Sequence, residues 1–375
     1  MSGTVETSGT AIEAPPPSSG RGEGIAQRLA LSIGPVILTL IGCGVLLAVI
    51  NRDPIAFYRD ILQGGLLRAS GLQDSITRMA PVLLMAAGLI VAFRASLWNL
   101  GADGQYLLSA AMVAGIAPTL LTMVPAPIGW VVLGLVAMAI GAAWTLVPSL
   151  LKARYGLNEI VTTLMMTFIG INLAVVLVSG PFDGPVAVPQ TAVLPPETML
   201  PDIPGTTIHI GFVVALVACL TTYLVFARTP FGMRLDVMGT NARAAVHLGI
   251  NVPRLIVMAF LISGGLIGLA AAMDIQGIFG YMRADWDPAY GLAVVPLVFL
   301  ARMNALALIP FAALFSLLSI GGLYAARRAA IPSDFVLLFM GILLLFMVGT
   351  QYLSDKRARG EPLLPARLRP SVAHG

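Results

Sequence analysis

Charged residues are scarce in this sequence, and their scarcity excludes most classes of soluble protein. Only 11% of the 375 residues are charged and 58% are hydrophobic, whereas soluble domains carry roughly a quarter charged residues. A water-soluble chain of this size would have too few charges to cover its surface. The mean hydropathy of +0.90 instead predicts an all-α polytopic membrane protein.

Lysine, cysteine and histidine are also rare. Lys152 and Lys356 are the only lysines, so the net charge of +4 comes mainly from arginine. In a membrane protein this basicity reports orientation, and we predict no nucleic-acid partner. Cys43 and Cys219 fall inside apolar runs and are interpreted as packing residues. None of the three histidines has a neighbour at metal-ligand spacing, so neither a metal nor a cofactor is expected.

Three catalytic motifs are missing. The sequence contains no phosphate-binding GxxxxGK[ST] loop, no HExxH zinc motif and no GxSxG nucleophile elbow. Any ATP hydrolysis that drives this protein must therefore come from a separate chain. A membrane enzyme is disfavoured, and a transport subunit or a secondary transporter remains.

Long apolar runs fill most of the chain. A hydrocarbon core of about 30 Å needs roughly 20 helical residues. By this criterion we expect ten transmembrane helices, within a range of eight to ten. The expected spans are 29–50, 76–96, 104–123, 126–151, 159–180, 208–227, 254–275, 288–302, 304–324 and 333–352. Pro118, Pro125 and Pro127 are expected to mark the turn between the third and fourth spans. The 288–302 segment is short and reads as a broken or re-entrant helix.

The sequence divides into a membrane domain, 25–352, and two tails. Residues 1–24 are rich in Ser, Gly, Thr and Pro and read as a disordered cytoplasmic tail. We expect no signal peptide, and the first apolar run to remain as an anchor. Residues 353–375 form a basic tail, also expected in the cytoplasm.

Charge placement predicts the orientation. The 181–207 loop has three acidic residues and no Lys or Arg, whereas the 152–158 and 228–254 loops are basic. The positive-inside rule places 181–207 outside and the basic loops inside. Arg327 and Arg328 do not follow the positive-inside rule, because a count of ten spans places them on the outer side. Either the count fails there or these arginines extend to outer headgroups.

The 228–254 loop is a polar insert between two apolar runs. Thr240 or Asn241 can cap a helix, Ala and Leu then favour helix, and Gly249 suits a helix end. A helix of about two turns is expected at roughly 241–248. One interpretation is an ordinary basic loop, and the other is a coupling helix that contacts a soluble partner.

Four segments, in order along the chain, resemble ABC importer permeases for nucleosides and simple sugars. They are "LWNLGADGQYLLSAAMVAG" (Leu97–Gly115), "YGLNEIVTTLMMTFI" (Tyr155–Ile169), the stretch Arg228–Met273, and "AYGLAVVPLVFLARMNALALIPFAALFSLLSIGG" (Ala289–Gly322). The resemblance covers roughly residues 76–350. One departure is Thr167, where the family pattern has Asn, which leaves the exact substrate open.

The resemblance implies a type II-like ABC importer permease fold in a bacterial inner membrane. It implies a second permease copy or paralogue, two ATP-binding subunits and an extracytoplasmic substrate-binding protein, with lipid around the bundle. Nucleosides are favoured as substrates, then simple sugars, then branched-chain amino acids. An ion-coupled secondary transporter is the competing hypothesis, but the span centres hold almost no acids.

Two sets of candidate site residues follow. The ATPase-coupling set is Gly239, Asn241, Ala242, Arg243, Ala244, Ala245 and Gly249. The translocation-path set is Asn99, Asp103, Gln105, Asn158, Glu159 and Thr167. Each polar path candidate has a structural alternative: Asp103 can cap the helix that begins near Gly104, and Asn158 and Glu159 can cap the fifth span. Gly264, Gly268 and Ala272 form a small helix face expected to pack closely. Asp274 and Gln276 are expected in a solvated loop, and the alternative is a docking surface for a binding protein.

Overall fold

The fold was examined in a computed structural model, which describes residues 37–38, 40–332 and 334–358. The predicted tail 1–24 and residues 359–375 of the second tail lie outside these residues. The described chain is helical, and within it the only β-type contacts are two isolated bridges, Gln190 with Arg283 and Asp202 with His209. The expected all-α class is confirmed.

Seven described helices are long and apolar enough to cross a membrane. They are α3 (Ala69–Arg94), α4 (Ala102–Met123), α5 (Ala126–Tyr155), α6 (Glu159–Ser179), α7 (Gly211–Arg228), α10 (Val252–Asp274) continued by the π-helix η3 (Ile275–Phe279), and α12 (Leu308–Ala329). The remaining expected spans correspond to a short helix at Leu40–Val49, to α11 (Tyr290–Leu300) and to α13 (Asp334–Ala358). With 11 residues, α11 is too short to cross, as expected of a broken helix.

Shorter helices connect the spans. They are α2 (Pro54–Leu62), the π-helix η1 (Gln63–Leu67), the 3-10 turn η2 (Pro196–Thr198), α8 (Pro230–Thr240) and α9 (Ala242–His247). The expected turn between α4 and α5 lies at Val124 and Pro125. Pro118 is inside α4 and does not mark it, because packing around a membrane helix tolerates an interior proline.

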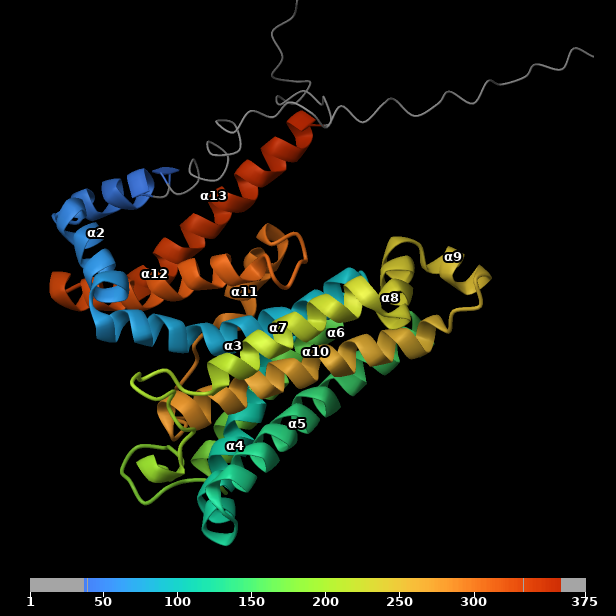
Figure 1. The fold of residues 1–375 in the computed structure, drawn as a ribbon, viewed down its shortest axis with the longest axis horizontal. Helices are drawn as coiled ribbons and strands as arrows, with labels where there is room; N and C mark the ends of the chain where they lie inside the picture. Colours follow the sequence, from blue (N-terminus) through green and yellow to red (C-terminus); the bar gives the residue numbers. More distant parts are fainter. Residues whose placement is uncertain (1–36, 39, 333, 359–375) are drawn as a thin grey trace, which may run out of the picture.

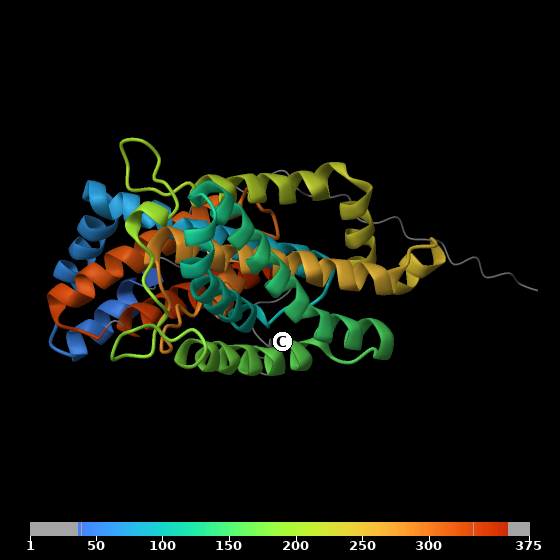
Figure 2. The same ribbon diagram turned by 90° about the horizontal axis from the view of Figure 1, so that it is seen from below.

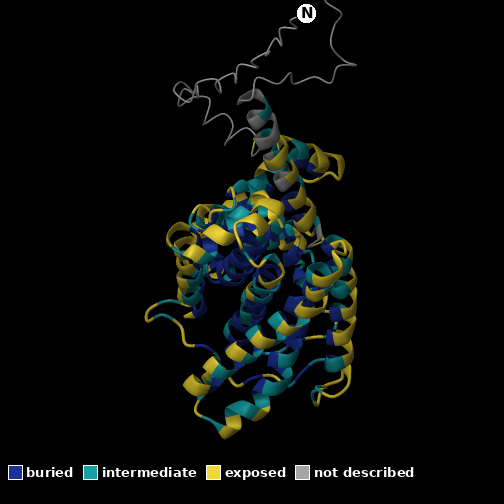
Figure 3. Ribbon diagram, turned by 90° about the vertical axis from the view of Figure 1, so that its right-hand side faces the viewer, coloured by how far each residue is buried: buried dark blue, intermediate teal, exposed yellow. Residues whose placement is uncertain are grey.

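The central element is α3. In its most apolar stretch 89% of residues are buried, against 22% in α6. It packs against α7, α10 and α12. Figure 3 shows the consequence: buried residues gather in the middle of the bundle and exposed ones on its outer helices. Large apolar side chains remain exposed on α6, among them Phe168 and Val176.

The closest helix pair is α5 with α10. A Cβ on Gly264 would lie 2.3 Å from the carbonyl oxygen of Gly141, and one on Gly268 would lie 2.0 Å from that of Ala137. Only glycine, whose side chain is a single hydrogen atom, allows the two helices to come this close. The expected role of the small face of α10 is therefore confirmed as structural.

The polar connections gather at two opposite ends of the bundle. Figures 1 and 2 both place α8 and α9 at one end and the 181–207 loop at the other. The loop is fastened to the first turns of α3, because the Gln73 side chain accepts from the backbone N–H of Thr207 at 2.9 Å. This separation agrees with the two sides expected from the charges.

The arginines that disagreed with the orientation lie at the end of α12. Arg328 donates to Asp60 of α2 at 2.9 Å, and its guanidinium also lies over the ring of Tyr324. The ion pair with Asp60 therefore neutralises the charge of Arg328. This pairing explains the position of one arginine without a change in the number of spans and without contact with outer headgroups. Arg327 is exposed beside Arg328.

Candidate functional site

The predicted helix in the polar insert is present as α9. The Asn241 side chain caps it by accepting from the backbone N–H groups of Arg243 and Ala244, each at 3.0 Å. Thr240 instead donates to the carbonyl of Asp236 and ends α8. Gly249 follows with φ of 74°, a left-handed conformation that glycine adopts without strain.

A second helix, α8, precedes α9 and was missed by the sequence analysis. Its signal is nevertheless in the sequence. Thr229 accepts from the N–H of Gly232 as the N-cap, and Pro230 occupies the first helical position, where proline needs no donor. The basic loop is therefore a helical hairpin.

This hairpin is fixed to the end of α3. Arg94 makes a bidentate pair with Asp236 of α8 and lies 4.1 Å from the ring centroid of Phe226. Ser96 donates to the carbonyl of Gly239 at 2.7 Å. A Cβ on Gly239 would lie 2.1 Å from the Arg94 carbonyl oxygen, so this glycine permits the contact.

By contrast, most of α9 is exposed. Ala245 is buried against the hairpin, while Ala242, Arg243 and Ala244 are exposed. The result is a small helical projection whose base is held by α8 and whose outer surface is uncovered. The residues predicted to couple to an ATPase thus form two groups. Gly239 and Ala245 pack at the base of the projection, and the others lie on its exposed surface.

Among the path candidates, Asn99 and Gln105 form a buried hydrogen-bonded pair. The Gln105 amide donates to the Asn99 side-chain oxygen at 2.8 Å, and Asn99 donates to the hydroxyl of Ser263 at 2.9 Å. Both side chains are almost fully buried. They join the turn before α4 to the middle of α10 and satisfy each other, which is the arrangement expected of a structural network.

Asp103 does not cap α4, contrary to the sequence-based alternative. Its carboxylate accepts from the backbone N–H of Gly291 at 2.6 Å, in the first turn of α11. A Cβ on Gly291 would lie 2.6 Å from this carboxylate. The sequence could not reveal the contact because the two residues are 188 positions apart. A negative charge at the start of the broken helix stabilises its positive end.

Asn158 and Glu159 begin α6 as expected. Asn158 accepts from the N–H of Ile160 at 2.9 Å, which makes it the N-cap. Glu159 forms an ion pair with Lys152 at 2.7 Å across the α5–α6 turn. Thr167 lies further along α6 and donates to the carbonyl of Leu100 at 3.1 Å. Thr167 and the Asn99–Gln105 pair therefore meet at one turn, while Asn158 and Glu159 lie apart from it.

A buried polar and aromatic cluster was missed. Asp274 and Gln276 are not in a solvated loop: their exposed fractions are 0% and 1%. Tyr106 donates to Asp274, and Arg78 donates to the hydroxyl of Tyr290 at 2.6 Å. The π-helix η3 continues α10 directly after Asp274, and Gln276 is buried within it. The sequence analysis ended the span at this point and so treated them as loop residues.

Part of this cluster has no hydrogen-bond partner among the described residues. The unpartnered atoms are one Asp274 oxygen and both amide atoms of Gln276. Nearby aromatic contacts join Tyr106 to Trp286 at 5.8 Å and Trp286 to Phe279 at 4.9 Å between ring centroids. In the described part of the chain no group of three His, Cys, Asp or Glu side chains is placed to hold a metal ion.

Geometry and sequence together define a multi-pass membrane protein with a basic helical hairpin at one end of its bundle. Residues 71–348 match the sequence profile of the family described as the permease component of the branched-chain amino acid transport system. The chain therefore belongs to this family of transport permeases. It is a transport component, and the resemblance seen in its motifs is confirmed.

Relatives match along almost the whole chain. The glucose ABC transporter permease protein of Haloferax volcanii is 28% identical over 343 residues, which cover 87% of this chain and 90% of the relative. The guanosine ABC transporter permease protein of Bacillus subtilis is 26% identical over 336 residues, covering 87% and 95%. A nucleoside ABC transporter permease protein of Lactococcus lactis is 26% identical over 330 residues, covering 82% and 87%. No solved structure matches this chain.

Proposed function

We propose that this chain is the membrane subunit of an ATP-driven importer and forms the path for a nucleoside or a simple sugar. The observation that carries the proposal is α9, an exposed helix of six residues whose base is held rigidly to the bundle. So short a helix is not stable alone in water. Its fixed base and bare outer surface suit contact with a separate ATPase subunit.

The coupling would work by displacement of this helix. Two ATPase subunits would close on ATP and push α9, with contacts at Asn241, Ala242, Arg243, Ala244 and Gly249. The motion would pass through α8 and the Asp236–Arg94 pair into α3. Because α3 is the packed centre of the bundle, the push would favour one of two arrangements of this chain against a second permease copy.

The path candidates take different roles in this proposal. Asn99 and Gln105 would position the turn before α4, since they satisfy each other. Asp103 and Thr167 would lie beside the path, where Asp103 holds the start of the broken helix α11. Asn158 and Glu159 would form the inner end of α6 near the ATPase side.

The partners and the orientation follow from the two ends of the bundle. The end with α9 would face the cytoplasm of a bacterium, together with both tails, 1–24 and 353–375. The opposite end, with the 181–207 loop, would receive an extracytoplasmic substrate-binding protein. Its three acidic residues and its lack of Lys or Arg support this side.

The substrate class rests on the relatives, which are named for glucose, guanosine and nucleosides. The aromatic rings near Asp274 and Gln276 suit a ring-shaped polar solute better than an aliphatic amino acid. Uptake of labelled nucleosides, pentoses, hexoses and leucine by the assembled complex would separate these substrates.

Charge reversal on α9 tests the coupling proposal. The double variant Arg243→Glu/Ala244→Glu should lose copurification of the ATPase subunits and substrate-dependent ATP hydrolysis, because it puts bulky acids on the docking surface. The permease itself should still fold, since both residues are exposed. Expression level and thermal unfolding in detergent would check this.

Arg154→Glu is the matched control, because it reverses an exposed charge at the end of α5, outside the hairpin. It should keep the ATPase bound. If the α9 double variant also kept the ATPase and ATP-dependent uptake, the coupling proposal would be wrong. Uptake that persists without any ATPase would instead support an ion-coupled transporter.

A further inference from the structure

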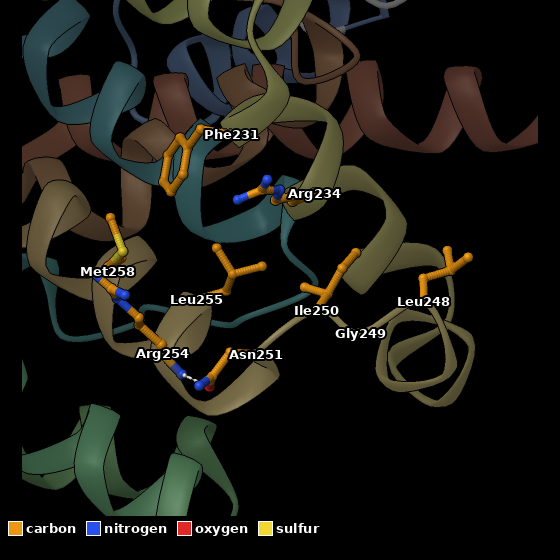
Figure 4. A pocket seen from close by; sticks show the side chains of 9 residues that line it. All are labelled: Phe231, Arg234, Leu248, Gly249, Ile250, Asn251, Arg254, Leu255 and Met258. Atoms are coloured by element: carbon orange, nitrogen blue, oxygen red, sulfur yellow. Dashed lines mark hydrogen bonds between the residues drawn. The ribbon is translucent and has the colours of Figure 1, made fainter.

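Two grooves meet at Phe231, at the junction of the cytoplasmic hairpin and the membrane bundle. The first, called here the basic groove, has a volume of about 430 Å³ and lies between α8 and the start of α10. Phe231, Leu255 and Met258 form its apolar floor. Figure 4 shows Arg234 on α8 and Arg254 on α10 among the side chains that line this space.

The basic groove holds two positive charges that the described chain does not neutralise. No acidic residue lines it, and the one acid of α8, Asp236, is paired with Arg94. Neither guanidinium has a carboxylate partner among the described residues. Two arginines that line one groove without a counter-charge favour an anion, and guanidinium groups match phosphate oxygens geometrically.

The second groove, called here the apolar trough, has a volume of about 680 Å³ between α5, α7 and α10. Its lining is apolar except for Thr221 and Thr222. On α7 it runs from Val214 to Phe226, twelve residue steps or roughly 18 Å at the helical rise of 1.5 Å. That length is about half of the 30 Å hydrocarbon core, so the trough spans one leaflet.

The two grooves are continuous. Phe231 lines both of them. On α10 the lining passes from Met258 in the basic groove to Leu261 in the apolar trough, which is less than one turn further along the helix. A ligand with an anionic head and an apolar tail of one-leaflet length fits this combination.

We propose that the basic groove and the apolar trough together bind one anionic phospholipid of the cytoplasmic leaflet. The phosphate lies between Arg234 and Arg254, and an acyl chain lies in the trough along α7. The membrane supplies this ligand at the depth where both grooves open. Because the head binds between α8 and α10, the lipid stabilises the hairpin that carries α9.

The site can be tested by lipid binding alone, independently of transport. The purified full chain is reconstituted in phosphatidylcholine vesicles with phosphatidylglycerol and re-extracted, and bound lipid is measured by native mass spectrometry. The wild-type chain should retain phosphatidylglycerol preferentially. Arg234→Gln/Arg254→Gln should weaken this binding about fivefold for each arginine.

Two further variants separate the head and tail contributions. Ala218→Phe fills the apolar trough and should reduce retention of the lipid while both arginines remain. Arg154→Gln removes an exposed positive charge at the end of α5 and should leave retention unchanged. Equal retention by the wild-type chain and the double arginine variant would overturn the proposal, as would an equal loss in the Arg154 control.

Other occupants give different outcomes. If excess inorganic phosphate displaced phosphatidylglycerol, the groove would be a soluble-anion site and the proposal would be wrong. If Val217→Cys on two copies formed an efficient disulfide cross-link in the membrane, a second chain would cover the trough. Each result overturns lipid binding without touching the assignment of α9.

Discussion

At the scale of single residues, the membrane part of this chain keeps most of its polar groups paired inside the protein. Asn99, Gln105 and Ser263 satisfy one another, and Asp274 accepts from Tyr106. An unpaired polar group in hydrocarbon costs several kcal/mol, so such pairing is what permits these residues in spans. The exceptions among the described residues include the amide of Gln276 and one oxygen of Asp274, which have no hydrogen-bond partner.

His209 is buried just before α7, and its burial predicts that the stability of the protein depends on pH. Burial lowers the pKa of its imidazole to about 4, from 6.5. Below pH 6.5 the unfolded chain therefore binds a proton that the folded chain does not. The free energy of unfolding should be highest above pH 6.5 and should fall by about 3 kcal/mol as the pH drops toward 4.

Equilibrium unfolding in detergent between pH 4 and 7.5 measures this effect. His209→Asn should remove it, because the amide oxygen can still accept from the N–H of Gly211 as the imidazole Nδ1 does at 3.1 Å. His247→Asn is the control, since this histidine is exposed. An unchanged pH profile in His209→Asn would contradict the assignment.

At the scale of elements, contacts through glycine and through single charge pairs determine how helices meet. The α5–α10 pair packs through Gly141, Gly264 and Gly268, whereas the α8–α3 junction depends on Gly239 and one ion pair. The first junction is a long rigid seam, and the second is a small local contact.

Neighbouring glycines of α10 give a matched test of the seam. A Cβ on Gly264 would lie 2.3 Å from the Gly141 carbonyl oxygen, whereas on Gly265 the nearest atom, the Met138 oxygen, would be 3.6 Å away. Gly264→Ala should therefore destabilise the protein by about 1–3 kcal/mol, the cost of overpacking. Gly265→Ala should be neutral or slightly stabilising. Thermal unfolding of both variants measures this difference. Equal stabilities would contradict close packing of α5 against α10 through Gly264.

At the scale of the whole molecule, the bundle is asymmetric, with a basic hairpin at one end and an acidic loop at the other. Broad apolar surfaces remain on α6, as expected for a helix on the outside of a membrane bundle. The proposed importer would use both ends, because the ATPase subunits would bind at one end and the substrate-binding protein at the other.

Cysteine labelling tests this orientation. Both native cysteines are fully buried, so their background reactivity should be low. On intact spheroplasts a membrane-impermeant maleimide should label Val188→Cys and should not label His247→Cys, since both positions are exposed but lie at opposite ends. Permeabilised membranes should label both. Labelling of position 247 from outside would reverse the proposed topology.

Local sequence signals predicted the elements best. The cap at Asn241, the glycine after α9, the cap at Asn158 and the broken helix α11 all depend on residues close together in the chain. The α8 helix was missed although its Thr-Pro start is a local signal. The partner of Asp103 and the burial of Asp274 were beyond sequence reasoning, because they arise from contacts between distant segments.

The sequence by itself determined that this is a membrane protein. It also determined which loops are basic and where the short capped helix lies. These properties are set by composition and by interactions within a few residues, which act before any packing forms. Only the tertiary structure decided which polar residues have hydrogen-bond partners, that the two arginines line one groove, and that Asp274 is buried. Those outcomes depend on which helix faces meet, and hydrophobicity alone is nearly the same on every face of these spans.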